Sequence, residues 1–182
     1  MSPYFSRIIF CVFVVLAGCT TTVQSTAPRE TLDGLAKWAL LPLSNNTDTP
    51  QAALSAESMV EHLLRRRGVQ NVMLYPAALS RDTLFEPSER KTSEEAREWA
   101  RTQGVRFALT GSVEEWRYKV GIDGEPAVGV TLKVIDLTDG RTVWSASGAK
   151  SGWSRQALSA VAQTVLTDAL AGLPLQTAAT RP

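Results

Sequence analysis

Histidine, cysteine and an excess of charge of either sign are what this sequence has least of. It contains one histidine and two cysteines among 182 residues. A structural zinc site takes about four such ligands, so a metal centre built from histidine and cysteine is nearly excluded. The 19 basic residues are balanced by 18 acidic ones. Nucleic-acid-binding domains normally carry a basic excess, so this balance argues against a nucleic-acid partner.

Apolar residues are present in the amount that one folded domain needs. They make up 44% of the chain and include five tryptophans. A chain of this size buries roughly two-thirds of its unfolded surface in a single core. The composition therefore excludes a wholly disordered chain and favours one domain over two.

A short export signal is predicted at the N-terminus. Arg7 is followed by the apolar run Ile8 to Leu16 and then by Leu16-Ala17-Gly18-Cys19. The run is far shorter than the ~20 residues that cross a bilayer as a helix, so it favours a secretory signal. Leu-Ala-Gly-Cys resembles the bacterial lipobox, in which the cysteine sulfur receives diacylglycerol. The alternative is an ordinary signal peptide with a chance cysteine.

Lipidation at Cys19 would remove residues 1–18 as the signal peptide. Cys11 would leave with it, so no disulfide is expected in the mature chain. Two or more acyl chains anchor a protein stably to a membrane. The residue after the cysteine is Thr20 rather than aspartate, which favours the outer membrane by the usual sorting rule. We expect a lipid-anchored outer-membrane protein that faces the periplasm.

The mature chain is predicted to be a single α/β domain over residues 35–173. A lipidated flexible tether over 19–34 precedes it, and a frayed C-terminal tail over 174–182 follows it. Hydrophobic periodicity and turn residues predict the order β-α-β-α-β-β-β-α, which favours a two-layer α/β sandwich with a mixed sheet. The strands are expected at 36–43, 72–75, 105–120, 128–134 and 142–149, and the helices at 50–67, 92–104 and 154–172.

The long strand over 105–120 carries a change of phase. Phe107 and Val113 fall on one face by strict alternation, whereas Trp116 and Tyr118 fall on the other. One extra residue near Glu114-Glu115 would bring them into phase, so we expect a β-bulge there. With the next strand, this segment forms a long hairpin, which is predicted to project past the helices.

Residues 108–154 carry a family resemblance, above all in the segments GSVEEWRYKVG, DGEPAVG and WSASGAKSGWS. Together with WALLPLSNNTDTPQA (38–52) and the lipobox, they resemble the PelC family of outer-membrane lipoproteins, which serve Pel exopolysaccharide secretion in biofilm formation. More distantly, the chain is similar to periplasmic lipoproteins of the CsgG, LpoB and TolB N-terminal type. The PelC resemblance implies a non-enzymatic ring, of twelve subunits, beneath an outer-membrane β-barrel of the PelB kind. It also implies an acidic lumen that guides a cationic amino-sugar polymer.

The resemblance assigns expected roles to particular residues. Cys19 is the lipidation site, and Trp153 is expected at the membrane or barrel. The alternative for Trp153 is a buried hydrophobic staple at the start of the last helix. The expected partners are further copies of the chain, the β-barrel export protein, outer-membrane lipid and the cationic exopolysaccharide; no cofactor or metal is expected. The expected oligomer interface comprises Arg106, Asp123, Glu115 and Trp116, of which Trp116 could equally be core. The expected acidic lumen comprises Asp82, Glu86, Glu89, Glu94 and Glu95, which could equally form a mixed solvated face.

Two other classes of function, an enzyme and a monomeric regulator, are alternatives to this interpretation. An enzyme could use Glu114 and Glu115 as paired carboxylates, but adjacent strand residues point to opposite faces unless the bulge redirects one. A Ser-His-Asp site would need His62 beside a serine and an acid, and no nucleophile-elbow motif is present. A monomeric regulator of a cell-wall enzyme, of the LpoB sort, is the other alternative. Arg65-Arg66-Arg67 fits a solvated helix end better than a lipid or polyanion patch.

Overall fold

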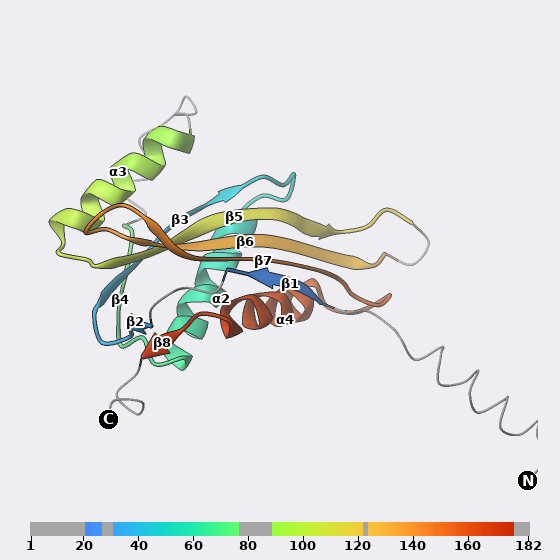
Figure 1. Ribbon diagram of the computed structural model, residues 1–182. Coiled ribbons are helices and arrows are strands. Elements are labelled where there is room, and N and C mark those ends of the chain that lie inside the picture. The colour runs from blue at the N-terminus through green and yellow to red at the C-terminus, as the bar shows by residue number, and fades with distance from the viewer. Residues whose placement is uncertain (1–20, 27–30, 77–88, 122–123, 177–182) are drawn as a thin grey trace, which may run out of the picture.

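The fold consists of one six-stranded mixed sheet, one two-stranded sheet and three helices. The computed structural model describes residues 21–26, 31–76, 89–121 and 124–176. The large sheet has the strand order β1-β7-β6-β5-β3-β4, and β2 pairs with β8 in the small one (Figure 1). The strands are β1 (Thr22–Ser25), β2 (Leu32–Asp33), β3 (Lys37–Asn45), β4 (Asn71–Leu74), β5 (Phe107–Tyr118), β6 (Pro126–Asp136), β7 (Thr142–Ser151) and β8 (Leu175–Gln176). The helices are α2 (Ala52–Arg66), α3 (Glu89–Thr102) and α4 (Leu158–Ala171). The predicted α/β class with a mixed sheet is confirmed.

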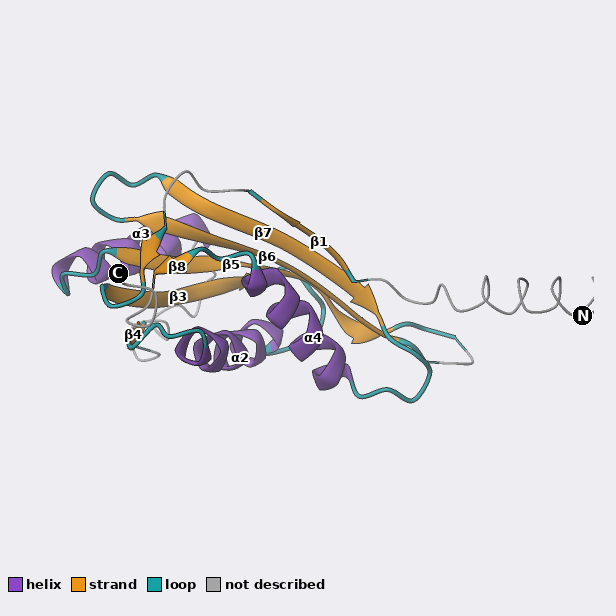
Figure 2. Ribbon diagram, turned by 60° about the horizontal axis from the view of Figure 1, so that its bottom comes forward, coloured by secondary structure: helices purple, strands orange, loops and turns teal. Residues whose placement is uncertain are grey.

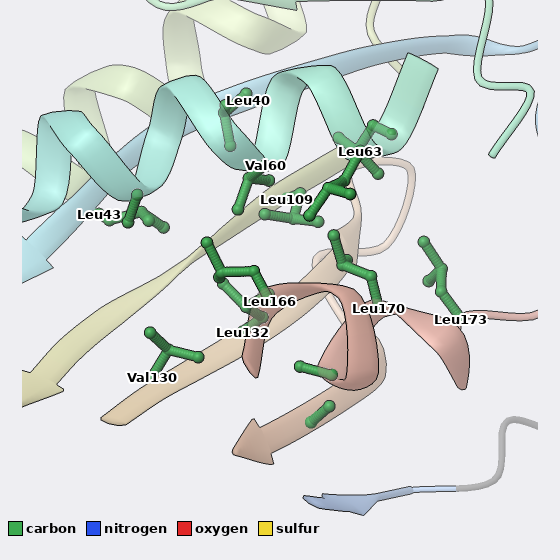
Figure 3. Packing of buried hydrophobic residues seen from close by; sticks show 14 of the residues in the cluster. Leu40, Leu43, Val60, Leu63, Leu109, Val130, Leu132, Leu166, Leu170 and Leu173 are labelled. Atoms are coloured by element: carbon green, nitrogen blue, oxygen red, sulfur yellow. The ribbon is translucent and has the colours of Figure 1, made fainter. Parts of the chain in front are cut away.

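The helices lie on both faces of the large sheet, which differs from a simple two-layer arrangement. Helices α2 and α4 cover one face, and α3 lies on the other (Figures 1 and 2). The main core packs Leu40, Leu109 and Leu132 of the sheet against Val60 and Leu166 of the helices (Figure 3). A smaller core on the opposite face packs Ala96 and Ala100 of α3 onto Ala39, Ala108 and Ile135. Helices therefore cover both faces of the sheet at the end where β5 begins.

The expected bulge in β5 is present. The pairing of β5 with β6 shifts between Val113 and Glu115, so Glu114 is the extra residue. The shift puts both Val113 and Trp116 in the main core. Tyr118, two residues further on, lies half exposed near the tip of the hairpin, which extends beyond α4 in Figure 1.

A second irregularity in β3 explains a proline in the middle of a sheet. The pairing of β3 with β5 shifts between Leu40 and Leu43, where Pro42 has no N–H to give to the ladder. Two side chains satisfy the backbone groups that this shift frees. The Leu43 N–H donates to Glu57 Oε1 of α2 at 2.8 Å. The Thr110 hydroxyl of β5 donates to the Pro42 carbonyl at 2.9 Å.

Parts of the expected tether and tail are ordered strands, so those expectations were wrong in part. Residues 22–25 form the edge strand β1, which runs antiparallel to β7. Residues 32–33 pair in parallel with residues 175–176. Both segments are short, and their pairing partners lie far away in the sequence. Local hydrophobic periodicity therefore carries no signal for them.

All three helices begin at residues other than the expected ones. Helix α3 begins at Glu89, one turn before the capping box expected at Thr92. Helix α4 begins at Leu158 rather than after Ser154. Its first N–H, that of Leu158, donates to the Tyr118 hydroxyl at 3.0 Å. The side chain that caps the start of α4 thus belongs to β5. Helix α2 begins at Ala52 and not at Pro50.

Candidate functional site

Large exposed hydrophobic side chains gather at the hairpin end of the large sheet. Trp153 is 64% exposed, Tyr118 is 51% exposed and Val120 is fully exposed. Tyr118 ends β5, Val120 follows it, and Trp153 follows β7. The sequence signalled Trp153 through the family resemblance. It did not single out Tyr118 and Val120 as exposed, because whether an apolar residue is covered depends on where the helices end.

The loop that carries Trp153 is held in place by backbone bonds. The Gly152 N–H donates to the Pro126 carbonyl at 2.7 Å, and the Trp153 N–H donates to Gln156 Oε1 at 3.1 Å. A Cβ at Gly152 would lie 2.6 Å from Val161 Cγ2 and 2.9 Å from the Pro126 ring, so a larger residue would require these side chains to shift. The indole thus projects from a fixed loop. The alternative of Trp153 as a buried staple for α4 is wrong.

Cationic side chains accompany the exposed hydrophobic residues. Lys119 lies between Tyr118 and Val120, and its Nζ donates to the Ser151 hydroxyl at 2.6 Å. Arg155 follows Trp153 with a positive φ of 66° and is exposed. Aromatic and cationic groups side by side suit the interface of a bilayer, where rings sit at the headgroup level and cations meet anionic lipid.

A shallow pocket of about 450 Å³ with acidic walls lies beside the bulge of β5. Its lining comprises Asn46, Thr47, Asp48, Thr49, Glu114, Glu115, Trp116, Arg117, Gly129 and Ala149. Hydrogen bonds from Ser112 and Asn46 lower the pKa of Glu114 below its usual value. Glu115 lies 3.1 Å from the Arg117 Nε. Glu114 is thus an anion at neutral pH, and the charge of Glu115 is partly offset by its cationic neighbour.

The expected interface residues lie in different parts of the fold. Arg106 precedes β5, whereas position 123 lies beyond the far end of that strand, outside the described residues. The strand that lies between them in the sequence has twelve residues and spans about 40 Å. Arg106 is exposed, with its Nε 3.8 Å from Asp136 Oδ2 and its guanidinium 4.7 Å from the centre of the Phe107 ring.

Trp116 belongs to the core, so the expectation that it forms an oligomer interface is corrected. It is 6% exposed, and its carbonyl accepts a hydrogen bond from the Thr49 hydroxyl. The bulge at Glu114 turns its ring inward. Glu115, one residue earlier, points to the opposite face and stays half-buried, so its expected interface role remains a proposal.

Two of the five expected lumen acids can be placed with their side chains. Glu94 and Glu95 are exposed on α3. Burial and the nearby charge of Glu95 raise the pKa of Tyr75. Glu89 opens the same helix, whereas Asp82 and Glu86 lie outside the described residues, as does Cys19. Helix α3 lies at the end of the sheet far from the β5–β6 hairpin tip (Figure 1).

The candidate catalytic residues are engaged in other contacts or lie apart. Glu114 accepts bonds from Ser112 and Asn46. His62 is exposed on α2, as its position in the helical pattern predicts. Within the described ranges, no group of three or more His, Cys, Asp or Glu could hold a metal ion. In the same ranges, none of the helices has the length and apolar character needed to span a bilayer.

The Arg65–Arg67 run is used mainly for structure. Arg65 pairs with Glu61 at 2.9 Å and donates to the Val72 carbonyl at 3.2 Å. Arg67 donates to the Leu173 carbonyl at 2.8 Å, which ties the end of α2 to the end of α4. Burial lowers the pKa of Arg67. These contacts favour the helix-end interpretation over a binding patch.

Comparison with solved structures identifies the family of this chain. A PelC dodecamer from Paraburkholderia phytofirmans in space group P6 is 40% identical, with a TM-score of 0.73, over 87% of this chain and 100% of that one. A PelC variant with one substitution, in space group C2, is 41% identical with a TM-score of 0.74, over 86% of this chain and 100% of that one. The class defined by this fold is therefore the PelC-type α/β domain. The chain belongs to the PelC family.

Other comparisons add little. Lipoprotein GNA1162 from Neisseria meningitidis is 16% identical with a TM-score of 0.49, over 67% of this chain and 84% of that one. Neither the protein-family models nor the curated proteins give a match.

Proposed function

We propose that this protein is a non-enzymatic, lipid-anchored subunit of an outer-membrane machine that exports the Pel exopolysaccharide in biofilm formation. Twelve copies would form a ring in the periplasm beneath a PelB-like β-barrel. The observation that carries the proposal is the 40% identity, over 87% of this chain, to a PelC that is a dodecamer. The match extends over the whole length of that relative, so the ring-forming domain is the part that the two share.

Two features of the surface support an orientation for this ring. Trp153, with Tyr118 and Val120, gives the hairpin end an apolar and cationic surface that suits lipid headgroups or the base of a barrel. Glu94 and Glu95 on α3 lie towards the other end of the sheet (Figure 1). We propose that the Trp153 end faces the outer membrane and that the acids of residues 82–95 contribute to an acidic lumen for a cationic polymer.

The native mass of the domain without its lipid tests the ring. A protein lacking residues 1–19, examined by light scattering, should give one species of about twelve times the subunit mass. A monomer or dimer would overturn the ring and would favour a regulator of a cell-wall enzyme, which acts as a monomer.

Anchoring is tested separately at Cys19. The variant Cys19→Ser should lose the acyl chains, leave the outer-membrane fraction and stop polymer secretion. Membrane fractionation and polymer staining measure both effects. Normal fractionation and secretion by this variant would show that lipidation does not place the protein.

A further inference from the structure

The chain enters the folded domain through a strand that is docked firmly on the sheet edge. Strand β1 pairs antiparallel with β7, Thr22 opposite Ala149. At the inner end of this ladder, the Thr26 N–H donates to the Ser145 carbonyl at 2.9 Å. The Ser145 N–H donates back to the Thr26 hydroxyl at 3.0 Å. Both the backbone N–H and the side-chain hydroxyl of Thr26 are thus bonded to the backbone of Ser145.

Side chains of β1 also pack against α4. A Cβ built on Gly148 of β7 would lie 3.4 Å from Val23 and 3.3 Å from Val165 of α4. The missing side chain at Gly148 therefore lets these two valines approach each other over the strand. Ser25 sits in the same way beside Gly172, at 3.0 Å from where a Cβ would be. Strand β1 is held by packing as well as by its ladder.

The register of β1 points its N-terminal end at the Trp153 end of the sheet. From Ala149, opposite Thr22, β7 runs on to Ser151 and then to Trp153. Figure 2 shows β1 alongside β7, with its start towards the hairpin end. Thr22 is the third residue after Cys19, and an extended chain covers about 3.3–3.6 Å per residue. The Cα of Cys19 is therefore held within about 11 Å of that of Thr22.

We propose that β1 is a docking strand that holds the lipid-anchored N-terminus on β7 and so keeps the Trp153 end of the sheet against the bilayer. The inference rests on the proposed lipidation of Cys19. Without β1, the next paired residue is Leu32 of β2, thirteen residues from Cys19, which allows about 45 Å of chain. On that longer chain, the tether itself no longer determines which side of the domain faces the membrane.

A matched pair of proline variants tests whether the β1–β7 hydrogen bonds themselves are needed. Bonded pairs alternate along an antiparallel ladder, so the bonds at Thr26 imply that the Gln24 N–H faces β7 and the Ser25 N–H faces away. Gln24→Pro removes a ladder bond, whereas Ser25→Pro removes none. Inserting ten Gly/Ser residues after Thr21 lengthens the chain while leaving β1 intact.

Orientation is read from fluorophores at the two ends of the domain. The probe is a vesicle of phosphatidylethanolamine and phosphatidylglycerol with spin-labelled headgroups, which quench nearby fluorophores. Lipidated protein carries a single label, either at Val120→Cys on the hairpin tip or at Gln70→Cys, an exposed position at the other end of the sheet. Circular dichroism first shows that each variant is folded.

The expected result is several-fold stronger quenching at position 120 than at position 70 in the wild-type background and in Ser25→Pro. Gln24→Pro and the ten-residue insertion should both bring this ratio close to one. A ratio that stays high in both variants overturns the docking strand. Wild-type protein that fails to float with the vesicles overturns the proposed anchoring as well, so the two failures are distinguishable.

Discussion

Burial at single residues decides what a side chain contributes, as Glu57 illustrates. Its carboxylate replaces the backbone partner that Leu43 loses at the β3 irregularity. Burial raises the pKa of Glu57 above its usual value, and the bond from Leu43 opposes this only in part. The side chain is thus needed as an acceptor, while its charge costs stability.

Glu57→Gln should therefore change the pH dependence of stability. A carboxyl with a raised folded-state pKa contributes stability that is fully present below pH 4.5, its unfolded pKa, and lost as pH rises through the folded-state pKa. The amide keeps an oxygen for Leu43 without the charge, so the variant should gain stability relative to wild type between pH 4 and 8. Urea unfolding across that range measures the difference, and parallel curves would contradict the prediction.

Glu57→Ala is the matched variant that removes the acceptor itself. The Leu43 N–H would then lack its partner, which costs about 1–3 kcal/mol. The free energy of unfolding of Glu57→Ala should lie below that of Glu57→Gln by that amount at every pH, because neither variant carries the charge. If alanine were as stable as glutamine, the bond to Leu43 would have no role in the fold.

The contribution of each tryptophan to stability should follow its burial. Trp144 is fully buried, and its indole N–H donates to the Gly172 carbonyl at 3.1 Å. Trp144→Ala should cost about 3–5 kcal/mol of stability, whereas Trp153→Ala should change it by less than about 0.5 kcal/mol. Thermal unfolding of the two variants checks this. A large loss in Trp153→Ala would mean that the exposed ring supports the fold rather than a partner.

At the scale of elements, strands β5 and β6 approach each other closely at Gly111. A Cβ on Gly111 would lie 2.0 Å from the Thr131 carbonyl oxygen. Gly111→Ala must therefore push β5 and β6 apart, and overpacking typically costs about 1–3 kcal/mol. Gly121→Ala, which meets nothing within 4 Å, is the control. Equal melting temperatures for the two variants would show that the strands yield without cost.

The elements that the sequence predicts well are those with their own hydrophobic pattern. The three helices, the strands β3, β4, β5, β6 and β7, and the bulge at Glu114 all follow from local periodicity, because each of these helices and strands has to bury one face. Strand β1 and the start of α4 could not be predicted in this way. The first depends on β7 and the second on the Tyr118 hydroxyl, and both partners are distant in the chain.

The candidate site was predictable only in part for a similar reason. Trp153 could be named from the family resemblance, and exposure agrees with it. Whether Trp116 is core or interface could not be decided from the sequence alone. The face of the sheet on which its side chain lies depends on the exact position of the bulge in β5. The exposure of Val120 could not be predicted, because it depends on where the helices stop covering the sheet.

At the scale of the whole molecule, Arg106 and Asp123 come before and after the twelve residues of β5 in the chain. In a ring, each subunit presents one surface to its neighbour and receives a different one, so residues at opposite ends can meet between copies. Asp123→Arg should lower the native mass, and Arg106→Glu should do the same. Combining the two should restore the ring, because a reversed pair still attracts. Native mass spectrometry checks this, and a single reversal that leaves the mass unchanged would remove the pair from the interface.

The proposed lumen makes a prediction about salt. Neutralising Asp82, Glu86 and Glu94 together should reduce polymer export. Glu94, the one of the three that the structure describes, is exposed, and exposed charges contribute little to folding, so we expect no loss of stability. A ring multiplies each charge, and walls of low dielectric focus the field on a cationic chain. The effect should be largest at low ionic strength, since screening acts over roughly 8 Å at physiological salt. Export assays at two salt concentrations test it. Normal export by the triple variant at low salt would place these acids outside the lumen.

The direction of β1 also determines how the domain bears mechanical load. The hydrogen bonds of an antiparallel ladder lie perpendicular to the strands. A pull on the chain before Thr22, along the strand axis, therefore loads the bonds from Thr22 to Thr26 at the same time. A pull from the other end of β1, across the sheet, would open them one after another. With the lipid anchor proposed above, tension between the membrane and this domain would load the ladder in shear, so that its bonds have to break together.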